Sequence, residues 1–195
     1  MSNFSDLSSN ITTNNVFDIN RLGLSNDFEA GKSLTFGLDY KLDPKENFQS
    51  EETKDKFLEL KLATVIRDQY ETGIPTRSTI NRKNSNIFGT INNNLLENIN
   101  FSYDFSLDND LKTINENTIG TEISINNFVT SFTLYEQRNE LGETHVISNT
   151  TEYKVNDNSS LKFSTRRNKE INLTEYYDLS YEYKNDCLTA ALKFN

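Results

Sequence analysis

The feature that most constrains the fold is an alternation of apolar and polar residues that recurs along most of the chain. In residues 34–42, for example, the apolar side chains of Leu34, Phe36 and Leu38 are separated by single polar or small residues. Side chains of a β-strand point alternately to the two faces of its sheet, so a period of two predicts strands with one apolar and one polar face. The period of 3.6 that indicates an amphipathic helix appears nowhere over any length. About ten such segments are present, at 34–42, 58–66, 87–91, 99–107, 119–125, 128–134, 147–155, 161–165, 173–183 and 188–194.

The connections between these segments predict an antiparallel sheet. They are too short for the crossovers that join parallel strands. Several consist of little more than Asn and Asp, which favour tight turns. Successive hairpins alternate between the two edges, which places the connections 93–98, 126–127, 156–158 and 185–186 on one edge and 68–85, 108–110, 138–144 and 168–172 on the other. The second edge therefore has the longest loop.

Alternation alone leaves two interpretations, because a soluble β-sandwich and an outer-membrane barrel both have one apolar face. Half of the predicted strands span 9–11 residues, which is the length that a transmembrane strand needs. Short turns on one edge and longer loops on the other are also typical of such barrels. We therefore predict an all-β fold, an antiparallel up-and-down transmembrane β-barrel sheet of about ten long strands that forms part of a barrel. Residues 1–30 would be an N-terminal segment leading into it, and residues 31–195 would form it.

Composition excludes several other classes of protein. The net charge of -9 and the pI near 4.7 argue against a nucleic-acid partner, which would require a basic face. One His and one Cys cannot supply the three or four ligands of a His/Cys zinc site, or a disulfide scaffold. No stretch is apolar enough for a helical membrane span, and residues 1–10 lack the apolar core of a signal peptide. The hydrophobic share of 34% is low, as expected when half of each strand faces a wet lumen.

Residues that could carry covalent chemistry are scarce. His145 is the one candidate general base, but no G-x-S-x-G elbow surrounds any serine, so a triad is not expected. We interpret His145 as a solvated residue beside the 138–144 loop. Glu51 and Glu52 lie in a charged connection and are also interpreted as solvated. The chain is therefore predicted not to be an enzyme and to have no catalytic residues and no cofactor.

An acidic cluster at the 108–110 turn raises the question of calcium. It has neither the spacing of an EF-hand loop nor its closing Glu. We therefore predict no metal site at its members, Asp104, Asp108 and Asp110.

Two stretches resemble a known family. Residues 15–23 read NVFDINRLG, and the pattern continues through Asp27, Glu29 and Gly31 to a strand that contains Gly37 and Tyr40. This resembles the NxF-x-x-NR, D-x-E-x-G and G-x-x-Y elements in the barrel of the LptD family of lipopolysaccharide-assembly proteins, also called organic-solvent-tolerance proteins. The stretch YEYKNDC at 181–187 resembles the Y-x-Y-x-x-D-C signature near the C-terminus of that family. The two matches bracket most of the chain in the right order.

The resemblance implies a function without covalent chemistry. Proteins of this family form a very large barrel in the bacterial outer membrane, with a plug lipoprotein inside. They receive lipopolysaccharide from a periplasmic bridge and release it into the outer leaflet through a lateral opening. The sequence resembles neither the periplasmic domain of the family nor a signal peptide. The chain would therefore correspond to the C-terminal part of the barrel. A small self-contained outer-membrane pore and a soluble β-sheet binding or structural protein remain alternatives.

The resemblance also assigns roles to particular residues. The cysteine of the C-terminal signature pairs in the family with a cysteine of the periplasmic domain, so Cys187 is a candidate for an inter-domain disulfide. The oxidising periplasm permits such a bond, and the alternative is a small residue with no role. The compact basic run of Arg166, Arg167 and Lys169 could contact the phosphates of lipopolysaccharide, since Arg binds such groups bidentately. The alternative is an ordinary cationic strand end.

Overall fold

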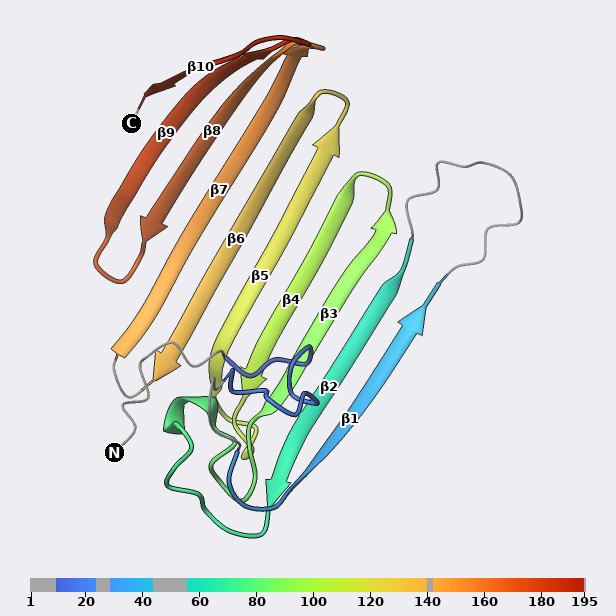
Figure 1. Cartoon of the computed structure of the whole chain (residues 1–195), viewed down its shortest axis with the longest axis vertical. Coiled ribbons are helices and arrows are strands. Elements are labelled where there is room, and N and C mark those ends of the chain that lie inside the picture. Colours follow the sequence, from blue (N-terminus) through green and yellow to red (C-terminus); the bar gives the residue numbers. More distant parts are fainter. Residues whose placement is uncertain (1–9, 24–28, 44–55, 140–141, 195) are drawn as a thin grey trace. The chain divides into compact units, whose positions relative to one another are not determined.

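The predicted strands form one sheet. The computed structural model describes residues 10–23, 29–43, 56–139 and 142–194. In these residues, ten strands pair antiparallel in sequence order, which confirms the all-β, up-and-down sheet (Figure 1). The order begins with β1 and ends with β10, so the sheet is open. No helix in the described ranges is long and apolar enough to cross a membrane. The elements are β1 (Ser33–Leu42), β2 (Leu58–Arg67), the short helix η1 (Thr76–Ser78), β3 (Ile87–Leu96), β4 (Ile99–Leu107), β5 (Ile114–Ile125), β6 (Phe128–Asn139), β7 (Gly142–Asn156), β8 (Ser159–Asn168), β9 (Leu173–Lys184) and β10 (Thr189–Phe194).

Strands β6 and β7 extend well beyond their apolar segments. The expected loop over 138–144 is wrong, because pairing continues through Arg138 opposite Glu143 to Asn139 opposite Gly142. Main-chain hydrogen bonds do not require apolar side chains, so the ladder runs on where the alternation has ended. The difference in length between the two edges is therefore smaller than predicted. Strand β3 likewise runs to Leu96, five residues beyond its expected end at Ile91.

The chain divides into two compact units, which are described separately. Unit 1 comprises residues 1–42, 59–91 and 104–116, and unit 2 comprises residues 43–58, 92–103 and 117–195.

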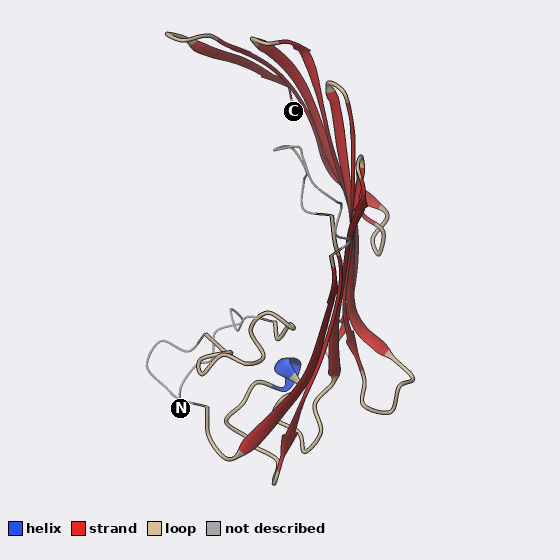
Figure 2. Ribbon diagram, turned by 90° about the vertical axis from the view of Figure 1, so that its right-hand side faces the viewer, coloured by secondary structure: helices blue, strands red, loops and turns tan. Residues whose placement is uncertain are grey.

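Unit 1 has a small hydrophobic core on the face that alternation predicts to be polar. Val65 belongs to the same face of β2 as Glu59 and Lys61, yet it is completely buried. The cover comes from residues 10–23 and from the loop between β2 and β3. Figure 2 shows the helix η1 and the neighbouring loops of this unit lying on one side of the strands. The buried apolar residues of this core are Ile11, Val16, Leu22, Ala63, Val65, Ile74, Ile80 and Phe88.

The apolar face of β1, also in unit 1, is uncovered. Leu34, Phe36 and Leu38 are 59%, 51% and 58% exposed. Three large apolar side chains of one strand are thus open to their surroundings, although a buried core lies on the opposite face. In a soluble sandwich the apolar face would be the covered one.

In unit 2 the register of β6 to β10 places like residues side by side. Phe128 is opposite Tyr153, which is opposite Leu161, and the row continues to Tyr181 and Leu192. All of these residues are partly exposed. Because directly opposite residues share a face, the register builds an apolar band across five strands.

The other face of these strands carries charged and hydroxyl side chains in matching rows. Glu152 is opposite Lys162, followed by Ser180 and Lys193. A shift of one residue in the register would place each row on the wrong face, so these matched rows favour a single register.

Asparagine builds the tight turns of unit 2. Asn126, between β5 and β6, has a φ of 51°, in the left-handed region that Asn tolerates better than most residues. The side-chain oxygen of Asn185 accepts hydrogen bonds from the main-chain N–H groups of Cys187 and Leu188, at 3.0 and 2.8 Å. The Asn-rich composition therefore serves the short hairpins directly.

Candidate functional site

The most elaborate polar arrangement in the described residues is centred on Arg21 in unit 1. Its guanidinium donates hydrogen bonds to the main-chain oxygen of Val16 at 3.1 Å, to Thr35 Oγ1 at 2.9 Å and to Ser33 Oγ at 3.0 Å. The N-terminal segment is thereby tied to the beginning of β1. Arg21 is 6% exposed, and burial lowers its pKa from the usual value, which lies far above neutrality.

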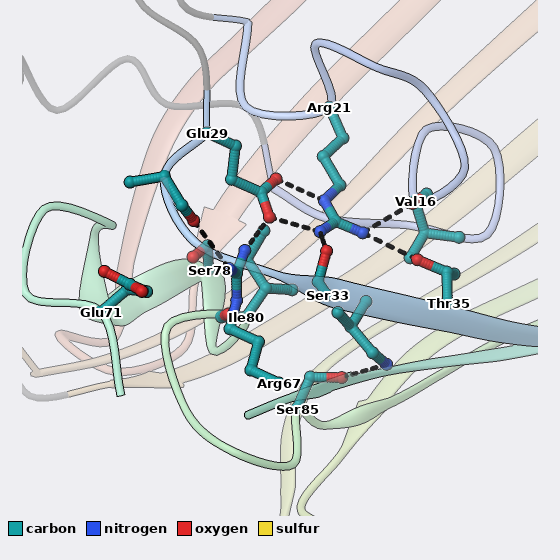
Figure 3. A network of polar contacts seen from close by, with 12 residues as sticks. Val16, Arg21, Glu29, Ser33, Thr35, Arg67, Glu71, Ser78, Ile80 and Ser85 are labelled. Carbon is teal, nitrogen blue, oxygen red and sulfur yellow. Dashed lines mark hydrogen bonds and ion pairs between the residues drawn. The ribbon is translucent and has the colours of Figure 1, made fainter. Parts of the chain in front are cut away.

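Glu29 lies between two arginines (Figure 3). Its carboxylate accepts a hydrogen bond from Arg21 Nε at 2.6 Å and pairs with Arg21 Nη2 and with Arg67 Nη2. Arg67, at the end of β2, also donates to the main-chain oxygens of Ala30, at 2.9 Å, and Ile80. We call Arg21, Glu29 and Arg67 the arginine–glutamate cluster.

This cluster fastens three segments that are distant in the sequence. It joins the N-terminal segment, the approach to β1, and the end of β2 with the loop that follows. Both arginines have side chains that are nearly inaccessible to water, so removal of the shared carboxylate would leave two buried cations without their partner. Buried charges of this kind are tolerated only when they are paired and hydrogen-bonded. The geometry therefore indicates a structural clamp rather than a reactive centre.

Two glycines of the family-like pattern allow close approaches within the same unit. A Cβ at Gly37 would overlap Cζ of Phe17, so the ring of Phe17 occupies the space above β1. Gly31 has a φ of +82°, and a Cβ there would overlap the carboxylate of Glu71. Only glycine fits both positions without a shift of these neighbours.

Asn15, the first residue of the same pattern, organises the N-terminal loop. Its Oδ1 accepts a hydrogen bond from the N–H of Thr12 at 2.8 Å, and its Nδ2 donates to the main-chain oxygen of Asn10 at 2.9 Å. Six residues of the family-like pattern therefore belong to one folded unit. They are Asn15, Phe17, Arg21, Glu29, Gly31 and Gly37.

A small hollow of about 280 Å³ lies beside the cluster, bounded by Val16–Ile19, Arg21, Glu29, Gly31, Ser33 and Thr35. Arg21 and Glu29, the two members of the arginine–glutamate cluster in its lining, are already paired with each other. Nothing in its lining offers a nucleophile beside a base, so no acyl- or phosphoryl-transfer chemistry follows from it.

The acidic cluster predicted not to bind metal has other partners. Asp104 accepts a hydrogen bond from Thr90 Oγ1 at 2.6 Å, and the hydroxyl of Thr90 also contacts that of Thr13 at 2.6 Å. Asp108 and Asp110 accept hydrogen bonds from main-chain N–H groups of their own turn, at 2.6 and 3.2 Å. No group of three or more His, Cys, Asp or Glu residues in the described ranges could hold a metal ion.

His145 was predicted to be a solvated residue beside a loop; the structure places it within a strand instead, with 38% of its side chain exposed. It lies in β7 directly opposite Glu136 of β6, and its Nε2 is 3.2 Å from Glu136 Oε1. Asn117 Nδ2 donates to the other carboxylate oxygen at 3.0 Å. The error has the same cause as the misplaced loop, since strand pairing continues through a polar stretch. Glu51 and Glu52 lie outside the described residues.

The basic run does not form one patch. Arg166 and Arg167 are neighbours in β8, and their side chains therefore point to opposite faces. Arg166 pairs with Glu175 at 2.7 Å, and Arg167 donates to Asn172 Oδ1 at 2.5 Å. The main-chain N–H of Lys169 donates to the oxygen of His145 at 2.7 Å. Their contact with lipopolysaccharide stays a prediction.

Cys187 is an exposed free thiol in the turn between β9 and β10. Its main-chain N–H is held by Asn185, which fixes the turn and leaves the side chain accessible. This position is compatible with the disulfide that the resemblance implies, and the pairing itself stays a prediction.

Comparison with known proteins adds no assignment. No protein-family model matches the chain, and no curated protein matches it.

Arg67, at the centre of the structural site, was missed from the sequence. It occupies a position at the end of a strand, and its partner Glu29 precedes another strand. A weak signal was available, because Arg67 follows Ala63 and Val65 on a face that is otherwise polar. Apolar residues on the face that is expected to be polar, followed there by a charged residue, indicate that another segment of the chain covers that face.

Proposed function

We propose that this chain is part of an outer-membrane β-barrel that exports lipopolysaccharide to the outer leaflet, and that it corresponds to the C-terminal part of that barrel. The observation that carries the proposal is the arrangement of unit 1. Its buried core and the arginine–glutamate cluster lie on the polar face, and the apolar face of β1 is left open. A barrel strand has this arrangement, because lipid covers its outer face and loops can fold into its interior.

Two further observations support the barrel over the alternatives that the sequence left open. The apolar band of unit 2, from Phe128 to Leu192, is partly exposed, as a lipid-facing surface requires. The described strands form an open sheet from β1 to β10, which favours part of a larger barrel over a small closed pore. The lipopolysaccharide substrate is inferred from the LptD-like residues, six of which contribute to the fold of unit 1.

In this proposal the partners are lipopolysaccharide, a plug lipoprotein and a periplasmic bridge. The chain acts without a catalytic residue or cofactor, because it guides lipopolysaccharide across the membrane and changes none of its covalent bonds. Cys187 would tie the barrel to the periplasmic domain, and Arg166, Arg167 and Lys169 are the residues for contact with lipid phosphates.

Photo-crosslinking in the bacterium that makes the protein tests this function. A photoreactive amino acid replaces Thr133, on the polar face of β6, and in a matched variant it replaces its neighbour Leu134 on the apolar face. We expect lipopolysaccharide adducts at position 133 that disappear when lipopolysaccharide synthesis is stopped. Adducts at 134 alone would reflect the surrounding membrane. Absence of adducts at 133, with the protein inserted, would contradict an export function.

A further inference from the structure

A second hollow, in unit 2, is not used by any role described above. It has a volume of about 360 Å³ and lies over β3, β4, β5 and β6, and Phe57 also contributes to its lining. Its lining residues are Phe57, Asn92–Asn94, Asn100–Ser102, Gly120–Glu122 and Ser131–Thr133.

We infer that the hollow lies on the polar face, because lining side chains meet there, with Asn100 hydrogen-bonded to Glu122 and Ser102 close to Gly120. Each of its four strands contributes three consecutive residues, and the outer two of each three share the polar face. The middle residues, such as Phe101 and Phe132, can then contribute only main-chain atoms to the floor. The contact between Asn100 Nδ2 and Glu122 Oε1, at 3.4 Å, joins two of the lining side chains across β4 and β5.

At Gly120 the hydroxyl of Ser102 packs closely against the main chain. A Cβ at this position would lie 2.5 Å from Ser102 Oγ, so no larger residue fits there without displacing Ser102. The surrounding side chains on adjacent strands, such as Ser131 and Thr133, are also short. Small residues of β4, β5 and β6 therefore lie close together in this part of the lining.

The chemistry of the lining selects among ligand classes. Amides donate and accept hydrogen bonds through one planar group, and Ser and Thr hydroxyls do both through one oxygen. Glu122 is the one charged residue of the lining, and no Lys, Arg or His accompanies it. A phosphate or carboxylate would be repelled by this carboxylate and would find no cation. A divalent cation would meet one carboxylate here, whereas the affinity of such sites rises with the number of charged ligands.

We propose that this hollow binds a neutral oligosaccharide segment. Sugar hydroxyls match the amide, hydroxyl and carboxylate groups of Asn92, Asn94, Asn100, Ser102, Glu122 and Thr133, and the C–H faces of sugar rings can lie against Phe57 and the carbon surface of the floor. The hollow is open to its surroundings, so we expect weak binding. The inference rests on the lining alone and does not require the proposed export function.

Saturation-transfer NMR on the full chain tests the proposal, with a maltose oligosaccharide as the probe and phosphocholine micelles as a sugar-free detergent. Thr133→Trp fills the hollow from the polar face. Thr150→Trp, on the same face of β7 outside the hollow, is the matched control. We expect saturation transfer to the neutral probe for the wild type and the control, and a signal at least about fivefold weaker for Thr133→Trp. The phosphorylated form of the probe should give no signal.

Any of three results would overturn the proposal: no signal with the wild type, equal signals from Thr133→Trp and Thr150→Trp, or equal binding of the neutral and phosphorylated probes. If Thr133→Trp does not fold, Asn100→Leu replaces it, since loss of the amide should also weaken the signal. If the chain proves soluble, the titration is repeated without detergent. The failure of the membrane proposal and the failure of the sugar site are then separate results.

Discussion

The polar faces of the two units differ in how they are used. In unit 1 this face is partly covered by residues 10–23 and the loop after β2, and three charged side chains are buried there in the arginine–glutamate cluster. In unit 2 the equivalent face has ion pairs that water reaches, such as Arg166 with Glu175 at 46% and 33% side-chain exposure. The same alternation thus produces a fixed, packed surface in one unit and an open, hydrophilic one in the other.

This difference shows that the contribution of an ion pair to stability cannot be judged from its residue types alone. In unit 1 the guanidinium groups of Arg21 and Arg67 can be buried because both pair with the Glu29 carboxylate. In unit 2, solvent screens each pair, and such pairs contribute about 1 kcal/mol or less. Unit 1 is therefore the structural anchor in our account, and unit 2 offers the surface that a polar cargo could follow.

The largest effect is expected from Glu29→Ala. Loss of this carboxylate leaves Arg21 and Arg67 buried without their shared partner, which should lower the free energy of unfolding by about 3–5 kcal/mol. The control, Glu175→Ala, removes an exposed partner of Arg166 and should cost less than about 1 kcal/mol. Denaturant titration in micelles, followed by circular dichroism, measures both. Equal losses would remove the distinction between the two units.

A somewhat smaller effect is expected from placing a charge on the uncovered face of β1. Leu38→Arg should cost about 2–4 kcal/mol in a lipid bilayer if this face meets the hydrocarbon core. The matched change Asp39→Arg, on the other face of the same strand, should cost much less. Unfolding from lipid vesicles measures the pair of free energies. Similar values for the two variants would argue against a lipid-facing surface.

The contact between Phe17 and Gly37 provides a finer test of how unit 1 is covered. Gly37→Val introduces a branched side chain where the ring of Phe17 lies, and should cost about 1–3 kcal/mol. In the Phe17→Ala background the same change should cost less, because the ring is gone. A double-mutant cycle of unfolding free energies gives the coupling. Additive costs would mean that the two residues do not meet.

Much of the fold was predictable from alternation, because each strand faces different surroundings on its two sides. The expected strand at 99–107 agrees with β4, and the one at 58–66 differs from β2 by one residue. The prediction failed where both faces are polar, as in β7 from Gly142 to His145. There the hydrogen bonds of the main chain decide the structure, and they leave no pattern in the side chains.

The candidate site was less predictable than the fold. Asn15, Arg21, Glu29 and Gly37 could be singled out by resemblance, but no spacing relates Glu29 to Arg67. Their meeting depends on how two loops return to the same face of the sheet. The register that aligns Phe128 with Tyr153 and Leu161 was likewise not given by periodicity, since periodicity constrains faces and not partners.

The central claim, that the apolar face meets lipid and the polar face does not, is tested most directly by a cysteine scan of β1. Cys187→Ser first removes the native thiol, and single cysteines at positions 34, 35, 36, 38 and 39 are then labelled with a fluorophore in vesicles that contain brominated lipids. We predict strong quenching at 34, 36 and 38 and little at 35 and 39. Equal quenching at all five positions, or none at any, would contradict the account.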